Sequence, residues 1–459
     1  MSNQDLSIAQ PHPEGADAIQ KMALAVVAVG ILILLVAFGG VTYGQNALFM
    51  WLSLSSIFVG TVVYSTRKYL SQTSGIKNNG VWQKGFTNRG IFAWMLGVFL
   101  TGFYVLLYWF PQYLGMANNG AENTGLVRLF DPLSFLLNGH AASQWFVYGT
   151  FYSLVVLSLG IKFMLKYRNN RYHLVRTFVV ILCQLSFAYI LPEVLSSLQR
   201  PDAYFSMDIK YFWPLNYSFF YKENLDALRS SGALGMFYLL TGLLMLLIVA
   251  PIVTYFVGKR WYCSWVCGCG GLAETAGDPF RHLSSKKVSA WKIERWLING
   301  VLVFVTVMTA FVLFTYFTGK FEAVAGTLKG AYGFFIGAIF SGLIGVGFYP
   351  IMGNRVWCRF GCPLAAYMGI IQRFKSRFRI TTNGGQCISC GNCSTYCEQG
   401  IDVRWYAQRG QNIVRSSCVG CGVCSSVCPR GVLKLENGPE EMRLNEEPFL
   451  IGLLKNKKD

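Results

Sequence analysis

Long apolar runs separated by short polar stretches dominate the first three quarters of the chain. A bilayer core requires roughly 20 consecutive apolar residues per helix, and about eight runs approach that length. After residue 380 polar residues, Gly and Cys replace the apolar runs. The pattern therefore predicts several membrane helices followed by a small polar domain. The predicted transmembrane helices lie near residues 22–43, 46–64, 91–110, 145–163, 174–192, 233–257, 297–318 and 331–352.

The distribution of basic residues predicts how these helices are oriented. The 459-residue chain has 40 Lys and Arg against 22 Asp and Glu, although only 14% of its residues are charged. The polar stretches that alternate along the chain hold 23 Lys and Arg on one predicted side and 7 on the other. Because basic residues near helix ends resist translocation, we expect a multi-pass protein of the cytoplasmic (inner) membrane with both termini in the cytoplasm. This topology accounts for the formal charge of +18. We therefore expect the protein to contact membrane lipid and not to bind nucleic acid.

Cysteines are concentrated in the second half, since thirteen of the fourteen lie after residue 262. Two runs, CISCGNCSTYC at 387–397 and CVGCGVCSSVCP at 418–429, share the spacing C-x2-C-x2-C-x3-C. In this spacing three cysteines bind one 4Fe–4S cluster and the fourth binds the other cluster. Zinc sites use separate C-x2-C pairs and fit an unbroken triplet less well. The predicted ligand sets are Cys387, Cys390, Cys393 and Cys428 for one cluster, and Cys418, Cys421, Cys424 and Cys397 for the other.

The two runs resemble those of bacterial two-cluster ferredoxins. The apolar runs predict a mainly α fold, a polytopic helical membrane protein with about eight transmembrane helices. The resemblance adds the expectation of a small C-terminal α+β ferredoxin-like domain. One departure is Glu398, which follows Cys397 where the ferredoxins usually have Pro, whereas Pro429 keeps that place in the second run. We expect Glu398 to alter the potential of the nearby cluster rather than its ligands. The predicted segments are a cytoplasmic tail at 1–21, a membrane domain at 22–380, the ferredoxin domain at 381–435 and a C-terminal tail at 436–459.

A second internal repeat follows two of the predicted membrane helices. GKRWYCSWVCG at 258–268 and GNRVWCRFGCP at 353–363 share the pattern G-x-R-x-x-C-x3-C. Both copies follow helices predicted to end on the cytoplasmic side, so their cysteines are expected to converge at one site. A helix beginning at Pro363 would direct the positive end of its dipole at the preceding cysteine, and the arginines would add charge that favours thiolate. The residues of this site are Cys263, Cys267, Cys358 and Cys362, supported by Arg260 and Arg355.

Two kinds of chemistry remain open for these membrane-side cysteines. One is a third metal centre, either an iron–sulfur cluster or copper, and the other is a redox-active dithiol. Packing alone explains two matched pairs poorly, and a permanent disulfide is disfavoured in the cytoplasm. Cys269 extends only the first copy, so it either replaces one ligand or remains as a spare.

Taken together, residues 233–429 resemble the membrane polyferredoxins typified by NapH, NosR and CcoG (FixG). The second copy matches the family motif C-x3-C-P through Cys358, Cys362 and Pro363, whereas Gly268 replaces Pro in the first copy. No loop is long enough for the flavin domain of the NosR type, and few residues follow Cys428 where the CcoG type has an immunoglobulin-like domain. By elimination the chain resembles the NapH type most.

The clusters and the resemblance predict transfer of single electrons between a cytoplasmic or quinol donor and a respiratory or maturation partner. Quinone is then a further candidate cofactor, and other membrane redox subunits are the expected partners. Two alternatives remain: a Cu(II) to Cu(I) reductase acting in oxidase or metalloenzyme assembly, and a non-catalytic assembly or scaffold subunit of a respiratory complex. The chain has no nucleotide-binding glycine fingerprint, so no NAD(P)H site is expected. No catalytic residue is predicted.

Overall fold

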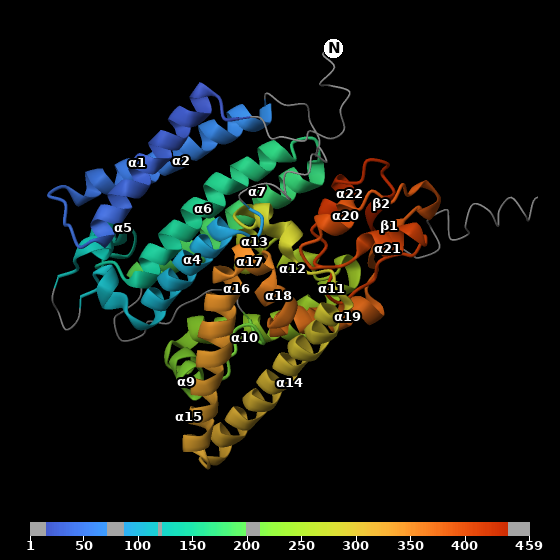
Figure 1. The fold of residues 1–459 in the computed structure, drawn as a ribbon. Coiled ribbons are helices and arrows are strands. Elements are labelled where there is room, and N and C mark those ends of the chain that lie inside the picture. The colour runs from blue at the N-terminus through green and yellow to red at the C-terminus, as the bar shows by residue number, and fades with distance from the viewer. Residues whose placement is uncertain (1–14, 71–86, 118–121, 199–211, 439–459) are drawn as a thin grey trace, which may run out of the picture. The chain divides into compact units, whose positions relative to one another are not determined.

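The computed structural model describes residues 15–70, 87–117, 122–198 and 212–438 (Figure 1). Within these residues eight helices are long and apolar enough to cross a membrane, which confirms the predicted polytopic helical membrane fold. Most of the predicted tails at 1–21 and 436–459 lies outside the described residues. The chain divides into two compact units, one drawn from residues 1–86, 90–210 and 271–278, the other from 87–89, 211–270 and 279–459.

The first unit contains five of the eight membrane helices. Its first two helices pack closely because a Cβ on Gly30 or Gly60 would lie 2.7 Å from a backbone oxygen of the other helix. Small residues permit such approach in membranes, where apolar side chains gain little by leaving lipid. A short π-helical turn, Ser186–Ile190, joins the last two helices of this unit. The helices are α1 (Ala18–Phe38), α2 (Asn46–Leu70), α4 (Ile91–Trp109), α5 (Gly125–Asn138), α6 (Gln144–Lys166), α7 (Arg171–Leu185) and α8 (Leu191–Leu198).

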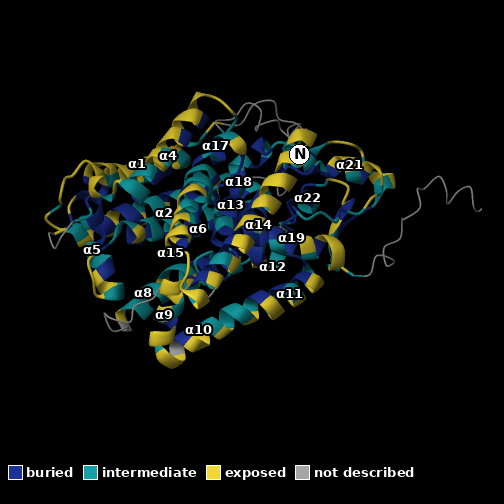
Figure 2. Ribbon diagram, turned by 90° about the horizontal axis from the view of Figure 1, so that it is seen from below, coloured by how far each residue is buried: buried dark blue, intermediate teal, exposed yellow. Residues whose placement is uncertain are grey.

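The second unit contains the other three membrane helices and the C-terminal domain. In Figure 1 the long helix α14 turns into α15, which returns antiparallel to it. Many residues of α10 and α14 are exposed in Figure 2, whereas α18 is almost entirely buried. The helices before the C-terminal domain are α9 (Lys222–Ser230), α10 (Gly232–Leu244), α11 (Ala250–Val257), α12 (Arg260–Cys263), α14 (Val288–Thr318), α15 (Glu322–Ala331), η7 (Tyr332–Ile344), α16 (Gly345–Gly347), α17 (Tyr349–Met352), α18 (Val356–Phe360) and α19 (Pro363–Lys375). Helix α13 (Gly268–Thr275) begins in the second unit, and its residues from 271 on belong to the first.

The boundaries of several membrane helices differ from the predicted ones, and the largest differences are in the last two. Helix α14 begins at Val288 rather than near residue 297, because its first turns are polar and an apolar run does not reveal them. The last membrane helix ends at Gly347 rather than near residue 352, and two short helices then lead into the second cysteine repeat. Hydrophobic length therefore identified each helix but not the polar turns that extend it.

The C-terminal domain has the predicted α+β character. Strands β1 (Phe378–Thr382) and β2 (Leu433–Asn437) pair antiparallel, with Ile380 opposite Leu435. Side chains from both ends of the domain, including Phe378, Ile380 and Leu433, form its buried core together with several cysteines. The sheet therefore closes a domain whose two cysteine runs lie between its strands. Its short helices are α20 (Asn392–Thr395), α21 (Val403–Gln408) and α22 (Val423–Ser426).

Candidate metal centres

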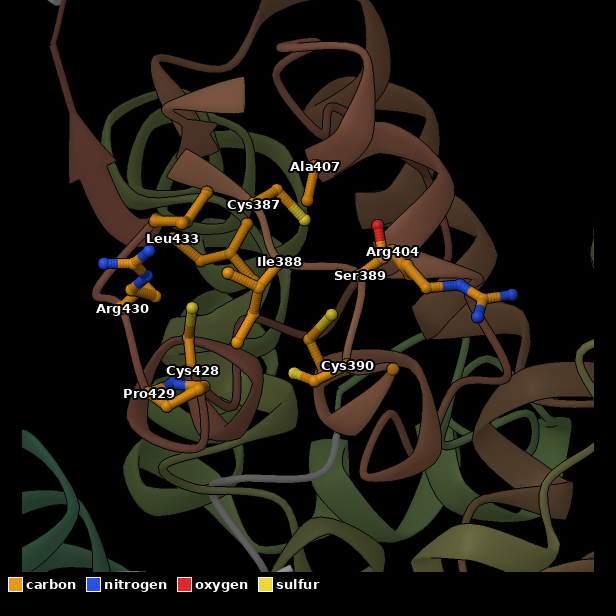
Figure 3. Close-up of a pocket in the computed structure, with 13 residues that line it drawn as sticks. Cys387, Ile388, Ser389, Cys390, Arg404, Ala407, Cys428, Pro429, Arg430 and Leu433 are labelled. Atoms are coloured by element: carbon orange, nitrogen blue, oxygen red, sulfur yellow. The ribbon is translucent and has the colours of Figure 1, made fainter. Parts of the chain in front are cut away.

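Two hollows in the C-terminal domain each gather four of the predicted ligands. The sulfur atoms of Cys387, Cys390 and Cys428 point toward a common space in Figure 3. Each hollow takes three cysteines from one run and a fourth from the other run, which is the arrangement that the spacing predicts. The first hollow is lined by Cys387, Cys390, Cys393 and Cys428, and the second by Cys397, Cys418, Cys421 and Cys424.

The backbone of the two runs turns in the same way. Gly391 and Gly422 have φ angles of 81° and 80° and precede α20 and α22. Two residues earlier, Ser389 and Gly420 also adopt left-handed conformations, with φ angles of 59° and 63°. Glycine adopts this conformation without strain, so the glycines allow the chain to wrap around a compact group. Ser389 is the exception, and its hydroxyl lies 2.7 Å from the Gln408 side-chain nitrogen.

Burial makes these thiols poor sites for an uncompensated charge. It raises the pKa of Cys418 to about 11 and that of Cys393 to about 12. Backbone N–H groups offset part of this cost, since the Ile401 N–H donates to the Cys397 sulfur at 3.4 Å. Iron would stabilise the thiolate directly, and iron–sulfur clusters are commonly held by four thiolates with N–H groups around them. The donor set of each hollow thus fits a 4Fe–4S cluster.

The membrane-side repeat forms the same turn twice. Cys263 and Cys358 lie in the short helices α12 and α18, and the second cysteine of each pair directly precedes the next helix. The Cys267 N–H donates to the Tyr262 carbonyl at 2.8 Å, and the Cys362 N–H donates to the Trp357 carbonyl at 3.0 Å. Each pair therefore spans a helix end and not one face of a continuous helix. In the second copy Pro363 begins α19, as predicted.

The cysteines of both copies converge in one buried core. Cys263, Cys267 and Cys362 share this core, and Cys269 packs against it. Burial raises the pKa of Cys362 well above its usual value, and the charges of Cys358, Cys263 and Cys267 raise it further. The Cys269 thiol donates a hydrogen bond to Cys267 and lowers the pKa of Cys267 to about 6. Five sulfur atoms, and not only the four of the repeat, are thus gathered here.

Two buried cations, Arg355 and Lys259, lie beside these sulfur atoms. The Arg355 Nη1 donates to the Cys263 carbonyl at 3.0 Å and lies 3.8 Å from the Cys358 sulfur. Arg260 instead stacks over the Phe378 ring, 4.9 Å from its centre. Its neighbour Lys259 is 1% exposed and lowers the pKa of Cys263, although burial raises that pKa to about 12 overall. Sequence reasoning missed Lys259, whose only signal was its place beside Arg260 in the repeat.

Polar contacts join the membrane-side site to the C-terminal domain. The Ser264 hydroxyl, between Cys263 and Cys267, donates to the Val419 carbonyl at 2.7 Å. Gln372 of α19 donates to the Cys418 carbonyl at 2.7 Å and accepts from the Lys259 N–H at 2.8 Å. Since Val419 and Cys421 also pack against the core that holds the membrane-side cysteines, this site and the second hollow are direct neighbours.

Comparison with known families supports an iron–sulfur interpretation of both regions. A model of a 4Fe–4S dicluster domain matches residues 380–435. A model of a 4Fe–4S binding domain matches residues 239–289 and 332–381, which contain the two membrane-side repeats. The chain therefore contains ferredoxin-type 4Fe–4S domains.

Curated relatives align with part of the chain. The electron transport protein YccM of Escherichia coli is 31% identical over 172 residues, which are 35% of this chain and 47% of YccM. The methylamine utilization ferredoxin-type protein MauN of Paracoccus denitrificans is 27% identical over 217 residues, covering 45% of this chain and 64% of MauN. MauN of Methylobacillus flagellatus is 25% identical over 170 residues, 35% of this chain and 55% of that protein. The chain thus spans about half to two thirds of the length of these relatives. No solved structure matches.

Proposed function

We propose that this protein is a membrane-bound electron carrier that moves single electrons through three 4Fe–4S clusters. Two clusters are held by the crossed ligand sets of the C-terminal domain. The third is held by Cys263, Cys267, Cys358 and Cys362, with Cys269 either replacing one ligand or remaining beside them. The observation that carries this proposal is the convergence of both repeat copies in one buried core. Neither copy has the four thiolates that a cluster requires, so only the two together can hold one.

The contacts support a linear order for the three clusters. The membrane-side site adjoins the cluster of Cys418, because Ser264 bonds to Val419 and Cys421 packs on the membrane-side core. The two clusters of the C-terminal domain are neighbours in turn, since the charge of Cys393 acts on the Cys424 thiol. Electrons would therefore pass from the membrane-side cluster to the second hollow and then to the first, or in the opposite direction.

Iron is favoured over copper at the membrane-side site. The 4Fe–4S binding model covers both C-x3-C copies, and the relatives are named for electron transport and as ferredoxin-type proteins. A soft thiolate set can also bind Cu(I), so metal content separates this proposal from a copper reductase.

For the whole protein we propose a role between a quinol or cytoplasmic donor and a membrane redox partner, within the NapH-like membrane polyferredoxins. A quinol releases two electrons and two protons, and single-electron clusters would accept those electrons one at a time. The 23 to 7 excess of basic residues supports an inner-membrane location with both termini and the ferredoxin domain, residues 381–435, in the cytoplasm. The membrane domain at 22–380 would then present its cysteine site on the cytoplasmic side.

The test is metal and sulfide analysis with EPR of the purified, reduced full chain. We expect about twelve iron atoms and about twelve sulfides per chain, with no stoichiometric copper. Changing Cys358 to Ser should reduce the iron to about eight and abolish electron transfer from a reduced donor to an acceptor, while both ferredoxin signals persist. Cys183→Ser, a buried cysteine of α7 in the first unit, is the matched control and should keep all three signals. Full turnover by Cys358→Ser, or copper in place of the third set of iron atoms, would contradict the proposal.

A further inference from the structure

A separate cavity lies in the second unit, where the first turns of α14 meet α19 and the loop that leads to Cys418. Its volume is about 260 Å³. Three arginines line it, one from each of these segments: Arg295, Arg373 and Arg415. The cavity is distinct from both ferredoxin hollows and contains none of the cysteines.

The three arginines have no carboxylate partner among the residues that the structure describes. The acidic side chain in the cavity wall, Glu294, is bound instead by Arg359 at 2.7 Å. Arg295 and Arg415 both stack on Trp291, at 5.2 and 4.8 Å from its ring centre. Stacking fixes the positions of two guanidinium groups but leaves their hydrogen-bond donors available. Three arginines therefore line one cavity, and within the described part of the chain none of them forms an ion pair.

A buried hydroxyl in the same cavity also lacks a partner. Ser417 is 7% exposed, and its Oγ makes no hydrogen bond within the described part of the chain. A buried polar group without a partner costs free energy, so such groups usually have a bound ligand or water nearby. Together with the arginines, this hydroxyl indicates an anion with several acceptor oxygens, which describes a phosphate group.

The surroundings of the cavity indicate an amphiphile rather than a soluble anion. Ile370 and Phe374 line its edge, and Phe374 is 70% exposed. On α14, a membrane helix, the neighbouring Trp296 is 83% exposed. Exposed aromatic and apolar residues at the end of a membrane helix are typical of the headgroup region of a bilayer. A ligand here could place an anionic headgroup on the arginines and its acyl chains along α14.

We propose that this cavity binds the phosphate headgroup of an anionic phospholipid. Basic pockets at the cytoplasmic ends of membrane helices recognise such headgroups by charge, whereas a neutral quinone would leave the three cations uncompensated. Because Arg415 lies three residues before Cys418, the lipid would join the cluster-binding loop to the membrane helix α14. The C-terminal domain would then be held to the bilayer by a lipid as well as by protein contacts.

The experiment compares lipids on the delipidated full chain in neutral detergent. Phosphatidylglycerol should raise the unfolding temperature, whereas phosphatidylcholine should have little effect, because binding to the folded state stabilises it. Replacing Arg295, Arg373 and Arg415 together with Gln should weaken the apparent affinity for phosphatidylglycerol by about a hundredfold, or roughly fivefold for each arginine. The visible absorption of the clusters reports whether each variant is folded.

Arg409→Gln is the matched control, because Arg409 stacks on Trp405 as Arg415 stacks on Trp291 but lies outside the cavity. It should bind phosphatidylglycerol as the unchanged protein does. Replacing the three arginines with Lys keeps the charge and should restore part of the affinity. The lipid assignment is wrong if inorganic phosphate alone gives the full stabilisation, or if the triple Gln variant binds phosphatidylglycerol as tightly as Arg409→Gln does.

Discussion

One carboxylate oxygen of Glu398 lies 2.9 Å from the guanidinium of Arg355, and the other lies 2.7 Å from Arg281. All three side chains are at most 2% exposed. Arg355 also contacts the Cys263 carbonyl and the Cys358 sulfur. The residue that follows Cys397, where ferredoxins usually have Pro, thus forms an ion pair with an arginine that contacts both copies of the membrane-side repeat.

This relationship predicts a large effect of neutralising Glu398. In Glu398→Gln the two arginines lose their buried counter-charge, and we expect the protein to lose about 3–5 kcal/mol of stability. The measurement is thermal or denaturant unfolding of the detergent-purified chain, followed by the absorption of the clusters.

The matched control is Glu223→Gln. It removes an ion pair of similar length, 2.8 Å from the Glu223 carboxylate to Lys329, but the Glu223 side chain is 68% exposed. Exposed pairs contribute less than about 1 kcal/mol, so its unfolding should change little. Equal losses in the two variants would mean that burial of the Glu398 pair does not matter.

The lining of the two hollows predicts which cluster is bound by the last cysteine of each run. Cys397 lies in the first run but lines the hollow of Cys418, Cys421 and Cys424. Cys397→Ser should therefore disturb the cluster of the second run and leave the first unchanged, whereas Cys428→Ser should do the reverse. EPR of the reduced variants, each compared with Cys183→Ser, measures both signals. Loss of only the first cluster in Cys397→Ser would refute the crossed arrangement.

The charge asymmetry predicts the membrane topology. Reporter fusions after residue 130 should be extracytoplasmic, and fusions after residue 440 should be cytoplasmic, because the loops rich in Lys and Arg remain inside. Alkaline phosphatase activity and fluorescent-protein folding distinguish the two sides. The reverse pattern would overturn the orientation but leave the cluster assignments unaffected.

His282 predicts a pH dependence of stability. Burial, and secondarily the charge of Lys286, lowers its pKa in the folded protein to about 4 from 6.5. As the pH falls, His282 is therefore protonated in the unfolded chain before it is protonated in the folded protein, and this favours unfolding. The stability that neutral His282 contributes is complete above pH 6.5 and should be lost as the pH falls toward 4. Allowing for its partial exposure, the loss is roughly 1–2 kcal/mol.

The comparison variant is His282→Gln, which cannot take up this proton. Between about pH 7 and pH 5 its unfolding temperature should fall less than that of the unchanged protein. Parallel pH profiles of the two proteins would show that His282 does not contribute.

Local properties of the sequence were sufficient to predict the membrane helices and how the cysteines of the C-terminal domain group around its two hollows. A membrane helix satisfies its own backbone hydrogen bonds and is identified by the length of its apolar run, so all eight were found. The ferredoxin spacing also acts locally, because two residues between cysteines fix how tightly the chain turns. The gathering of Cys397 with Cys418 follows from that spacing.

Only the tertiary structure decided which distant residues complete the membrane-side site. The repeat predicted that its two copies would meet, but the places of Cys269, Lys259 and Arg355 depend on how α12, α18 and α19 pack. The partner of Glu398 was likewise invisible, since Arg355 lies more than forty residues earlier, with no pattern that links the two. Periodicity and spacing describe neighbours along the chain, whereas buried charges are paired by whichever elements the fold brings together.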